Sequence, residues 1–174
     1  DLALRPSGSK GLLVSSLSGF DEYQEHSAWI WEHQALTRAR HCAGDRSVGD
    51  AFELIRKKIL TREREPKALA REILGMREKI HAAHPNTSAL FDLKHDRGGM
   101  IDIEFAVQFL VLAHAHRHAD LTGNLGNIAL LGIAADLGLL DRKSADDCRN
   151  AYRTFRKLQH GLRLNQARYA RVPL

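Results

Sequence analysis

The first residues of the chain combine a carboxylate, two cations and a glycine-rich loop. Asp1 and Arg5 precede the loop Ser-Gly-Ser-Lys-Gly, which contains Ser7, Gly8 and Lys10. A carboxylate can hold Mg²⁺, which bridges phosphate oxygens during phosphoryl or nucleotidyl transfer. Arg5 and Lys10 can neutralise those oxygens, and glycines let the backbone approach them closely. Short glycine-rich patterns also occur in ordinary charged turns, so that interpretation stays open.

A second group of candidates lies in a helical segment with two tryptophans. Glu32 follows Trp29 and Trp31, and Arg38 and Arg40 come later in the same segment. We expect the tryptophans to pack in the core, as large aromatic side chains usually do. The two arginines either bind an anion or belong to a solvated helix face.

A third group surrounds the start of the most apolar segment. Gly98 and Gly99 stand directly before Met100, where free backbone N–H groups at a helix start attract anions. Asp102 falls in the first turn, so capping and compensation of the helix dipole explain it equally simply. Glu104 lies among apolar residues, and a carboxylate there requires a partner or a functional role.

The histidines and cysteines of the sequence give little support for a zinc site or for a catalytic nucleophile. His114 and His118 stand one turn apart, as zinc ligands can, but no cysteine is near and no third ligand follows at metal-site spacing. A position at a helix C-terminus accounts for these histidines and for His116. Cys42 and Cys148 form no CxxC pattern, which predicts two free thiols in a reducing, cytoplasmic environment.

The overall composition is that of a soluble domain. The 174 residues are 44% hydrophobic and 27% charged, with a formal net charge of +5. Basic residues are mixed with acidic ones and aromatics are only 6%, which argues against a nucleic-acid-binding surface. No apolar run approaches the length of a membrane span. Because the chain opens inside an apolar alternation without a methionine, we expect it to be part of a longer protein.

Apolar spacing and capping residues predict a mainly helical chain. Short strands are expected at 1–6 and 12–14, a loop with one apolar stretch at 86–99, and breaks at Gly44-Asp45, Gly123-Asn124 and Gly138. The predicted helices are one capped by Ser16 or Ser18, followed by helices at 28–40, at 48–60, from Pro66 to His84, and at 100–117, 125–137 and 142–166. The fold class is therefore all-α, a helical bundle following a small β remnant.

Three segments together resemble one known family. "DLALRPSGSKGLLVSS", "AWIWEHQALTRAR" and "FDLKHDRGGMIDIEFAVQFLVL" are similar, in order and spacing, to glutamine synthetase adenylyltransferases. The resemblance extends along nearly the whole chain. Such enzymes carry two related nucleotidyltransferase halves, one that removes AMP from glutamine synthetase and one that adds it. The sequences of the first two segments resemble the C-terminal, adenylylating half of these enzymes.

This resemblance implies a fold and roles for the first residues. Residues 1–45 would be the C-terminal remnant of a nucleotidyltransferase domain similar to DNA polymerase β, and residues 46–174 a helical domain. Asp1 would be the third carboxylate of the Mg²⁺ site for ATP, followed by Arg5 and the phosphate loop. The family often has arginine where this chain has Ala3. The family's Gly-Ser and Asp-x-Asp elements would precede the chain, so we expect no transferase activity from these 174 residues alone.

The resemblance also implies partners: glutamine synthetase, the PII signalling protein, and glutamine as effector. Three alternatives remain open. The chain could belong to the AMP-removing half, or be a non-catalytic helical interaction module with a binding surface on residues 48–84 or 142–166. A basic helical nucleic-acid binder would show steeply salt-dependent binding to duplexes. Gly98, Gly99, Asp102 and Glu104 fall in a family signature whose role the residues alone do not give.

Overall fold

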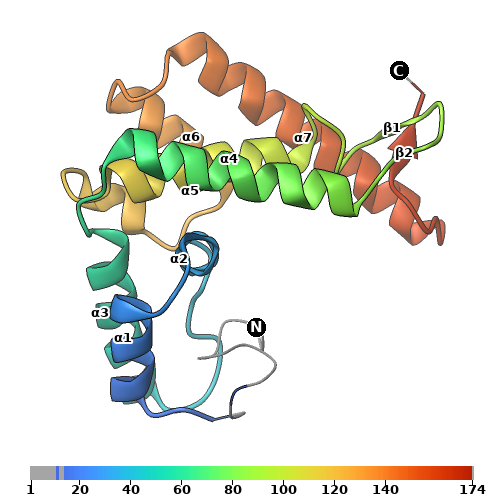
Figure 1. The fold of residues 1–174 in the computed structure, drawn as a ribbon. Coiled ribbons are helices and arrows are strands. Elements are labelled where there is room, and N and C mark those ends of the chain that lie inside the picture. The colour runs from blue at the N-terminus through green and yellow to red at the C-terminus, as the bar shows by residue number, and fades with distance from the viewer. Residues whose placement is uncertain (1–10, 12–13, 174) are drawn as a thin grey trace. The chain divides into compact units, whose positions relative to one another are not determined.

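The computed structural model describes residue 11 and residues 14–173, and this part of the chain is mostly helical (Figure 1). It divides into two compact units. One unit contains the chain up to Leu69 together with Val111–Asn124, and the other contains Ala70–Leu110 and Leu125–Leu174. The prediction of a helical chain is confirmed. Both predicted N-terminal strands fall wholly or largely outside the described residues.

Seven α-helices and one two-stranded sheet make up the described part. The helices are α1 (Leu17–His26), α2 (Ile30–Leu36), α3 (Arg46–Leu60), α4 (Pro66–Ala83), α5 (Met100–His114), α6 (Asn127–Asp136) and α7 (Arg142–Leu164). A 3-10 helix, η3, covers Ala119–Thr122. Strands β1 (Phe91–Asp92) and β2 (Arg171–Val172) pair antiparallel, with Phe91 opposite Val172.

Side-chain caps fix where several helices begin. Ser16 caps α1, because its Oγ accepts from the N–H of Gly19 at 3.1 Å. Asp45 caps α3 through the N–H of Ser47, and Asp141 caps α7 through that of Ser144. Each cap satisfies a backbone donor that the helix itself leaves unpaired. The predicted Ser16 cap and the predicted break at Asp45 are both confirmed.

The prediction that both tryptophans pack in the core is wrong. Trp29 is 69% exposed and Trp31 is 39% exposed. Helix α2 starts only at Ile30, so it is shorter than the predicted segment 28–40, and Trp29 is its N-cap. The buried side of α2 is formed instead by polar residues and Leu36.

The first unit is held together around α3, which packs against α1 and α2. Leu36, Ile59 and Leu60 form its apolar centre, almost completely buried. Arg56 is also completely buried, and its guanidinium donates to the carbonyl oxygens of Leu36 at 2.8 Å and Thr122 at 2.9 Å. A charged group without water is tolerated there because its donors are paired with backbone acceptors.

A buried histidine is enclosed by two hydrogen bonds in the same unit. The Nε2 atom of His33 lies 3.0 Å from the carbonyl oxygen of Gln24, and Nδ1 lies 3.4 Å from Nη2 of Arg64. The arginine can only donate, so Nδ1 accepts and the proton of the neutral ring sits on Nε2. Burial, and then the positive charges of Arg64 and Arg62, lower the pKa of His33 to about 4 despite the Gln24 bond. Burial likewise lowers the pKa of Arg64 to about 10.

The second unit contains the packed pair α6 and α7 and the small sheet. Leu130, Leu131 and Ala134 of α6 and Ala145 and Tyr152 of α7 are buried. The sheet was not predicted: β1 falls in the expected loop 86–99, and β2 follows the last predicted helix. Cys42 and Cys148 are free thiols, as predicted. No helix within residues 14–173 is both long and apolar enough to cross a membrane.

His33 should make the stability of the first unit depend on pH. Its folded pKa is below the ordinary value of 6.5, so the unfolded chain takes up a proton at a pH where the folded chain does not. The stabilising contribution is complete above pH 6.5 and is lost as the pH falls towards 4. We expect a loss of at most about 3 kcal/mol in the free energy of unfolding across that window.

Urea unfolding of the chain and of His33→Gln at several pH values between 4 and 7.5 measures this loss. The difference between the two should shrink as the pH falls, because glutamine keeps a donor but does not titrate. His160→Gln, at an exposed position on α7, is the matched control and should keep the slope of the parent. Parallel pH profiles for the parent and His33→Gln would contradict the assignment.

Candidate functional site

The five residues predicted to bind Mg²⁺ and nucleotide lie outside the described part of the chain. They are Asp1, Arg5, Ser7, Gly8 and Lys10. Their roles stay predictions. Within the described residues, no group of three or more His, Cys, Asp and Glu side chains is arranged to hold a metal ion.

Glu32 joins the second half of α1 to the start of α2 in a structural network. It is 1% exposed and accepts the N–H of Trp29 at 2.8 Å and the hydroxyl of Tyr23 at 3.0 Å. A carboxylate three residues after the N-cap often bonds back to the cap in this way. Arg38 and Arg40 follow the end of α2 and are both exposed. Their predicted anion binding stays a prediction.

Gly98 and Gly99 are required by the backbone before α5. Gly98 has φ +82°, which residues with a Cβ rarely adopt. A Cβ on Gly99 would lie 2.9 Å from the carbonyl oxygen of Asp96 and 3.0 Å from that of Leu93. The twin glycines therefore let the loop fold tightly back on itself as α5 begins.

The backbone donors at the start of α5 are already occupied. The N–H groups of residues 99–102 donate to carbonyl oxygens within residues 93–99 at 2.9–3.3 Å. The N–H of Gly98 donates to Oδ2 of Asp102. These bonds match the capping interpretation of Asp102 rather than a phosphate-binding helix start, because they engage the groups that would face a phosphate.

Arg77 of α4 is the partner that sequence reasoning missed. Its side chain is buried, and its Nε donates to Oδ1 of Asp102. Its Nη2 donates to the carbonyl oxygens of His95 at 2.9 Å and Asp96 at 3.2 Å. The only sequence signal is the position of Arg77 one turn after the buried Ile73. One guanidinium thus joins α4, the loop 93–99 and the first turn of α5.

Glu104 has a buried partner in α7. The hydroxyl of Tyr152 donates to its Oε1 at 2.7 Å. Burial, and then the bond to Glu104, raise the pKa of Tyr152. The carboxylate thus has the partner that its apolar surroundings require, and any catalytic or interface role for it stays a prediction.

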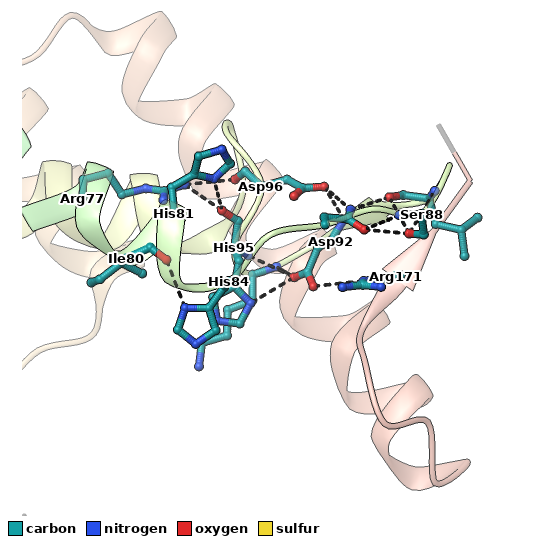
Figure 2. A network of polar contacts seen from close by, with 12 residues as sticks. Arg77, Ile80, His81, His84, Ser88, Asp92, His95, Asp96 and Arg171 are labelled. Atoms are coloured by element: carbon teal, nitrogen blue, oxygen red, sulfur yellow. Dashed lines mark hydrogen bonds and ion pairs between the residues drawn. The ribbon is translucent and has the colours of Figure 1, made fainter.

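Asp92 of β1 fixes the other end of the loop (Figure 2). It accepts the N–H groups of Lys94 and His95, both at 3.0 Å, and Nε of Arg171 at 3.3 Å. Burial alone would raise the pKa of Asp92, but these donors together hold it below its usual range. The anionic carboxylate therefore links the loop to β2.

An apolar hollow of about 320 Å³ lies between α4 and α5 in the second unit. It is lined by Ala70, Ile73, Leu74, Arg77, Asp102, Phe105, Ala106 and Phe109. Leu74 is 62% exposed at this surface. A concave apolar surface of this size suits an apolar side chain or small apolar group better than it suits a nucleotide.

Two family models match successive parts of the chain. Residues 1–55 match the model described as glutamate-ammonia ligase adenylyltransferase. Residues 67–171, more than half of the chain, match the model described as GlnD PII-uridylyltransferase. The chain belongs to this second family.

Several curated relatives match along almost the whole chain, and all are bifunctional glutamine synthetase adenylyltransferase/adenylyl-removing enzymes. That of Burkholderia pseudomallei is 56% identical over 178 residues, covering 99% of this chain and 19% of the relative. That of Aromatoleum aromaticum is 57% identical over 165 residues, 95% of this chain and 18% of the relative. That of Bordetella bronchiseptica is 57% identical over 173 residues, covering 99% of this chain and 18% of the relative. The chain therefore spans about a fifth of the length of these relatives.

Replacing Asp102 by asparagine should destabilise the second unit. The change keeps the size of the side chain but removes the charge opposite the buried Arg77. We expect a loss of about 2 kcal/mol in the free energy of unfolding, reduced from that of a fully buried pair because Asp102 is partly exposed. Glu78→Gln removes the exposed ion pair with Arg97 and should cost less than about 0.5 kcal/mol. Equal urea-unfolding midpoints for the two variants would contradict a central role for Asp102.

Proposed function

We propose that the chain is part of an enzyme that regulates glutamine synthetase by transferring AMP from ATP to a tyrosine of the synthetase. The observation that carries this proposal is the 56–57% identity to enzymes of that name over 95–99% of the chain. At that level of identity, both the helical core and the loop before α5 have counterparts in the relatives.

The two family models are named for different enzymes. The sequence identity to adenylyltransferases along almost the whole chain favours the adenylyltransferase. The relatives match both residues 1–55 and residues 67–171, although the second model is named for PII uridylylation. We therefore infer that the helical segment is a domain type shared by both kinds of enzyme. The substrate is decided by the longer protein in which the segment lies.

Within the longer enzyme we assign the chain to the C-terminal, adenylylating half. Residues 1–45 would end a polymerase-β-like domain, and residues 46–174 would form the helical domain behind it. Asp1 would hold Mg²⁺, which supplies charge neutralisation at the ATP phosphates, and Arg5 and Lys10 would bind those phosphates beside Ser7 and Gly8. Several carboxylates are needed to fix two metal ions, so the 174 residues alone should be inactive.

The proposed partners are glutamine synthetase as substrate, PII as signalling protein and glutamine as effector, all in the cytoplasm. The name of the second family model mentions PII, which supports a link to nitrogen signalling. In this arrangement the residues around Arg77 are a rigid support, because their polar groups bond mainly to one another.

A second candidate function is a non-catalytic interaction module. The observation that favours it is the apolar hollow between α4 and α5, beside the exposed Leu74. Apolar grooves between helices commonly receive apolar side chains of a partner. On this reading the hollow contacts the synthetase directly, and nucleotide chemistry happens elsewhere in the longer protein.

Activity should appear only when the chain is extended upstream by one catalytic domain. The 174-residue chain and the extended chain would each receive Mg²⁺, labelled ATP and unmodified glutamine synthetase. We expect AMP incorporation by the extended chain alone, and its loss on Asp1→Asn, because that carboxylate holds the metal. Asp120→Asn, at an exposed position in η3, should leave labelling unchanged.

Two results would overturn parts of this proposal. Labelling by the short chain alone would place the catalytic carboxylates within the 174 residues. Loss of label from AMP-loaded synthetase in the presence of phosphate, without forward transfer, would assign the chain to the adenylyl-removing half.

The interaction-module candidate makes a separate prediction for Ala106, which lines the hollow and is exposed. Ala106→Arg should weaken binding of the chain to glutamine synthetase at least about tenfold, since it puts a charge into the apolar surface. Ala129→Arg on α6 introduces the same side chain at another exposed helical position and should bind like the parent. Calorimetric titration measures both, and equal affinities would remove this candidate.

A further inference from the structure

We propose that His84 and His95 form a proton-sensitive latch that holds the loop before α5 against the end of α4. This inference does not depend on the proposed enzymatic function. It rests on the arrangement of two imidazole rings and their neighbours in the second unit.

The two rings are stacked face to face. Their centroids are 4.2 Å apart and their planes differ by 3°. His84 directly follows the last residue of α4 and is exposed, and its Nδ1 lies 3.0 Å from the carbonyl oxygen of Ile80 (Figure 2). The stack therefore joins the C-terminal turn of α4 to the loop that carries His95.

His95 is held more firmly than His84. Its Nδ1 lies 3.3 Å from Oδ1 of Asp92, and its carbonyl oxygen accepts from Arg77 at 2.9 Å. The Nδ1 atom of His81 lies 3.4 Å from the same carbonyl oxygen. If the two rings separate, the loosely held and exposed His84 is the one that leaves.

The charged groups around the pair come from three elements. Helix α4 contributes Arg77 and His81, the loop with β1 contributes Asp92, Lys94 and Asp96, and β2 contributes Arg171. Burial lowers the pKa of His95, Asp92 raises it, and His84 and Lys94 lower it further. The charge of Asp92 is shared with Arg171, so it only partly offsets a proton on His95.

The stack of the His84 and His95 rings is stable when one ring is protonated and unstable when both are. A neutral ring over a cationic ring attracts it, whereas two cationic rings at 4.2 Å repel each other. Because Asp92 keeps a protonated His95 in place, double protonation expels His84. The last turn of α4 then loses the ring contact that ties it to the loop.

The bonds of Arg77 to Asp102 and to the carbonyl oxygens of His95 and Asp96 limit how far this opening spreads. A guanidinium does not lose its proton in the physiological range, so the bonds of Arg77 to Asp102 and to the loop carbonyls persist. The latch therefore loosens the end of α4 at His84 in weakly acidic solution, while His95 and the tight turn at Gly98 and Gly99 stay in place.

The test is an NMR titration of the His95 ring in the full chain between pH 8 and 4.5. In His84→Phe the stack is kept without a second proton, so His95 should titrate at least about half a pH unit higher than in the parent. His84 is exposed, so the substitution removes no core contact.

Amide hydrogen exchange measures the opening itself. Protection of the His84 amide, which donates to the carbonyl oxygen of His81 at 3.2 Å, should fall at least about fivefold from pH 7 to pH 5 after correction for the intrinsic pH effect. It should change little in His84→Phe. His81→Gln, from the same helix end but outside the stack, and His160→Phe, on α7, should both behave like the parent. Identical His95 titration in the parent and in His84→Phe, or pH-independent protection in the parent, would overturn the proposal.

Discussion

The ion pair between Arg77 and Asp102 is the constraint on which the second unit depends. It connects the middle of α4 to the first turn of α5, and the same guanidinium binds two carbonyl oxygens of the loop between them. Burying an arginine is costly unless its donors are paired, so the loop must present those carbonyls. That requirement explains the left-handed Gly98 and the close approach at Gly99. The segment Gly-Gly-Met-Ile-Asp-Ile-Glu, residues 98–104, therefore supplies the two glycines and the carboxylate that this arrangement needs.

Buried arginines that bind carbonyl groups recur through the molecule. Arg56 bonds the ends of α2 and η3, and Arg64 bonds carbonyl oxygens of Ile59 and Leu112 in the first unit. Each satisfies acceptors that a helix end leaves unpaired. Part of the basic composition is therefore internal and structural. The buried carboxylates of Glu32 and Asp92 balance the buried Arg56 and Arg77, so burial leaves the formal net charge at the surface close to +5.

The sequence predicted the helices well and the site only in part, for physical reasons. Apolar spacing and caps are local signals, so Ser16, one of the two predicted caps, and Pro66 marked helix starts, and Gly44-Asp45 marked a break. The sheet pairs Asp92 with Arg171 across 79 positions, and two-residue strands carry no periodicity of their own. The partners of Asp102 and Glu104 were hidden for the same reason, because the side chains that meet them lie 25 and 48 residues away. The prediction that the tryptophans are buried failed for a different reason. Aromatic size predicts burial only where the residue lies on a helix face that packs against the core.

Acidic side chains of the described residues stabilise contacts between helices and loops. Their conspicuous carboxylates, Glu32, Asp102 and Glu104, each bond to a donor of this chain, namely Trp29, Arg77 and Tyr152. These bonds join helices and loops, which gives each of the three carboxylates a structural role. The residues that define this helical segment therefore fix its loops and helix ends.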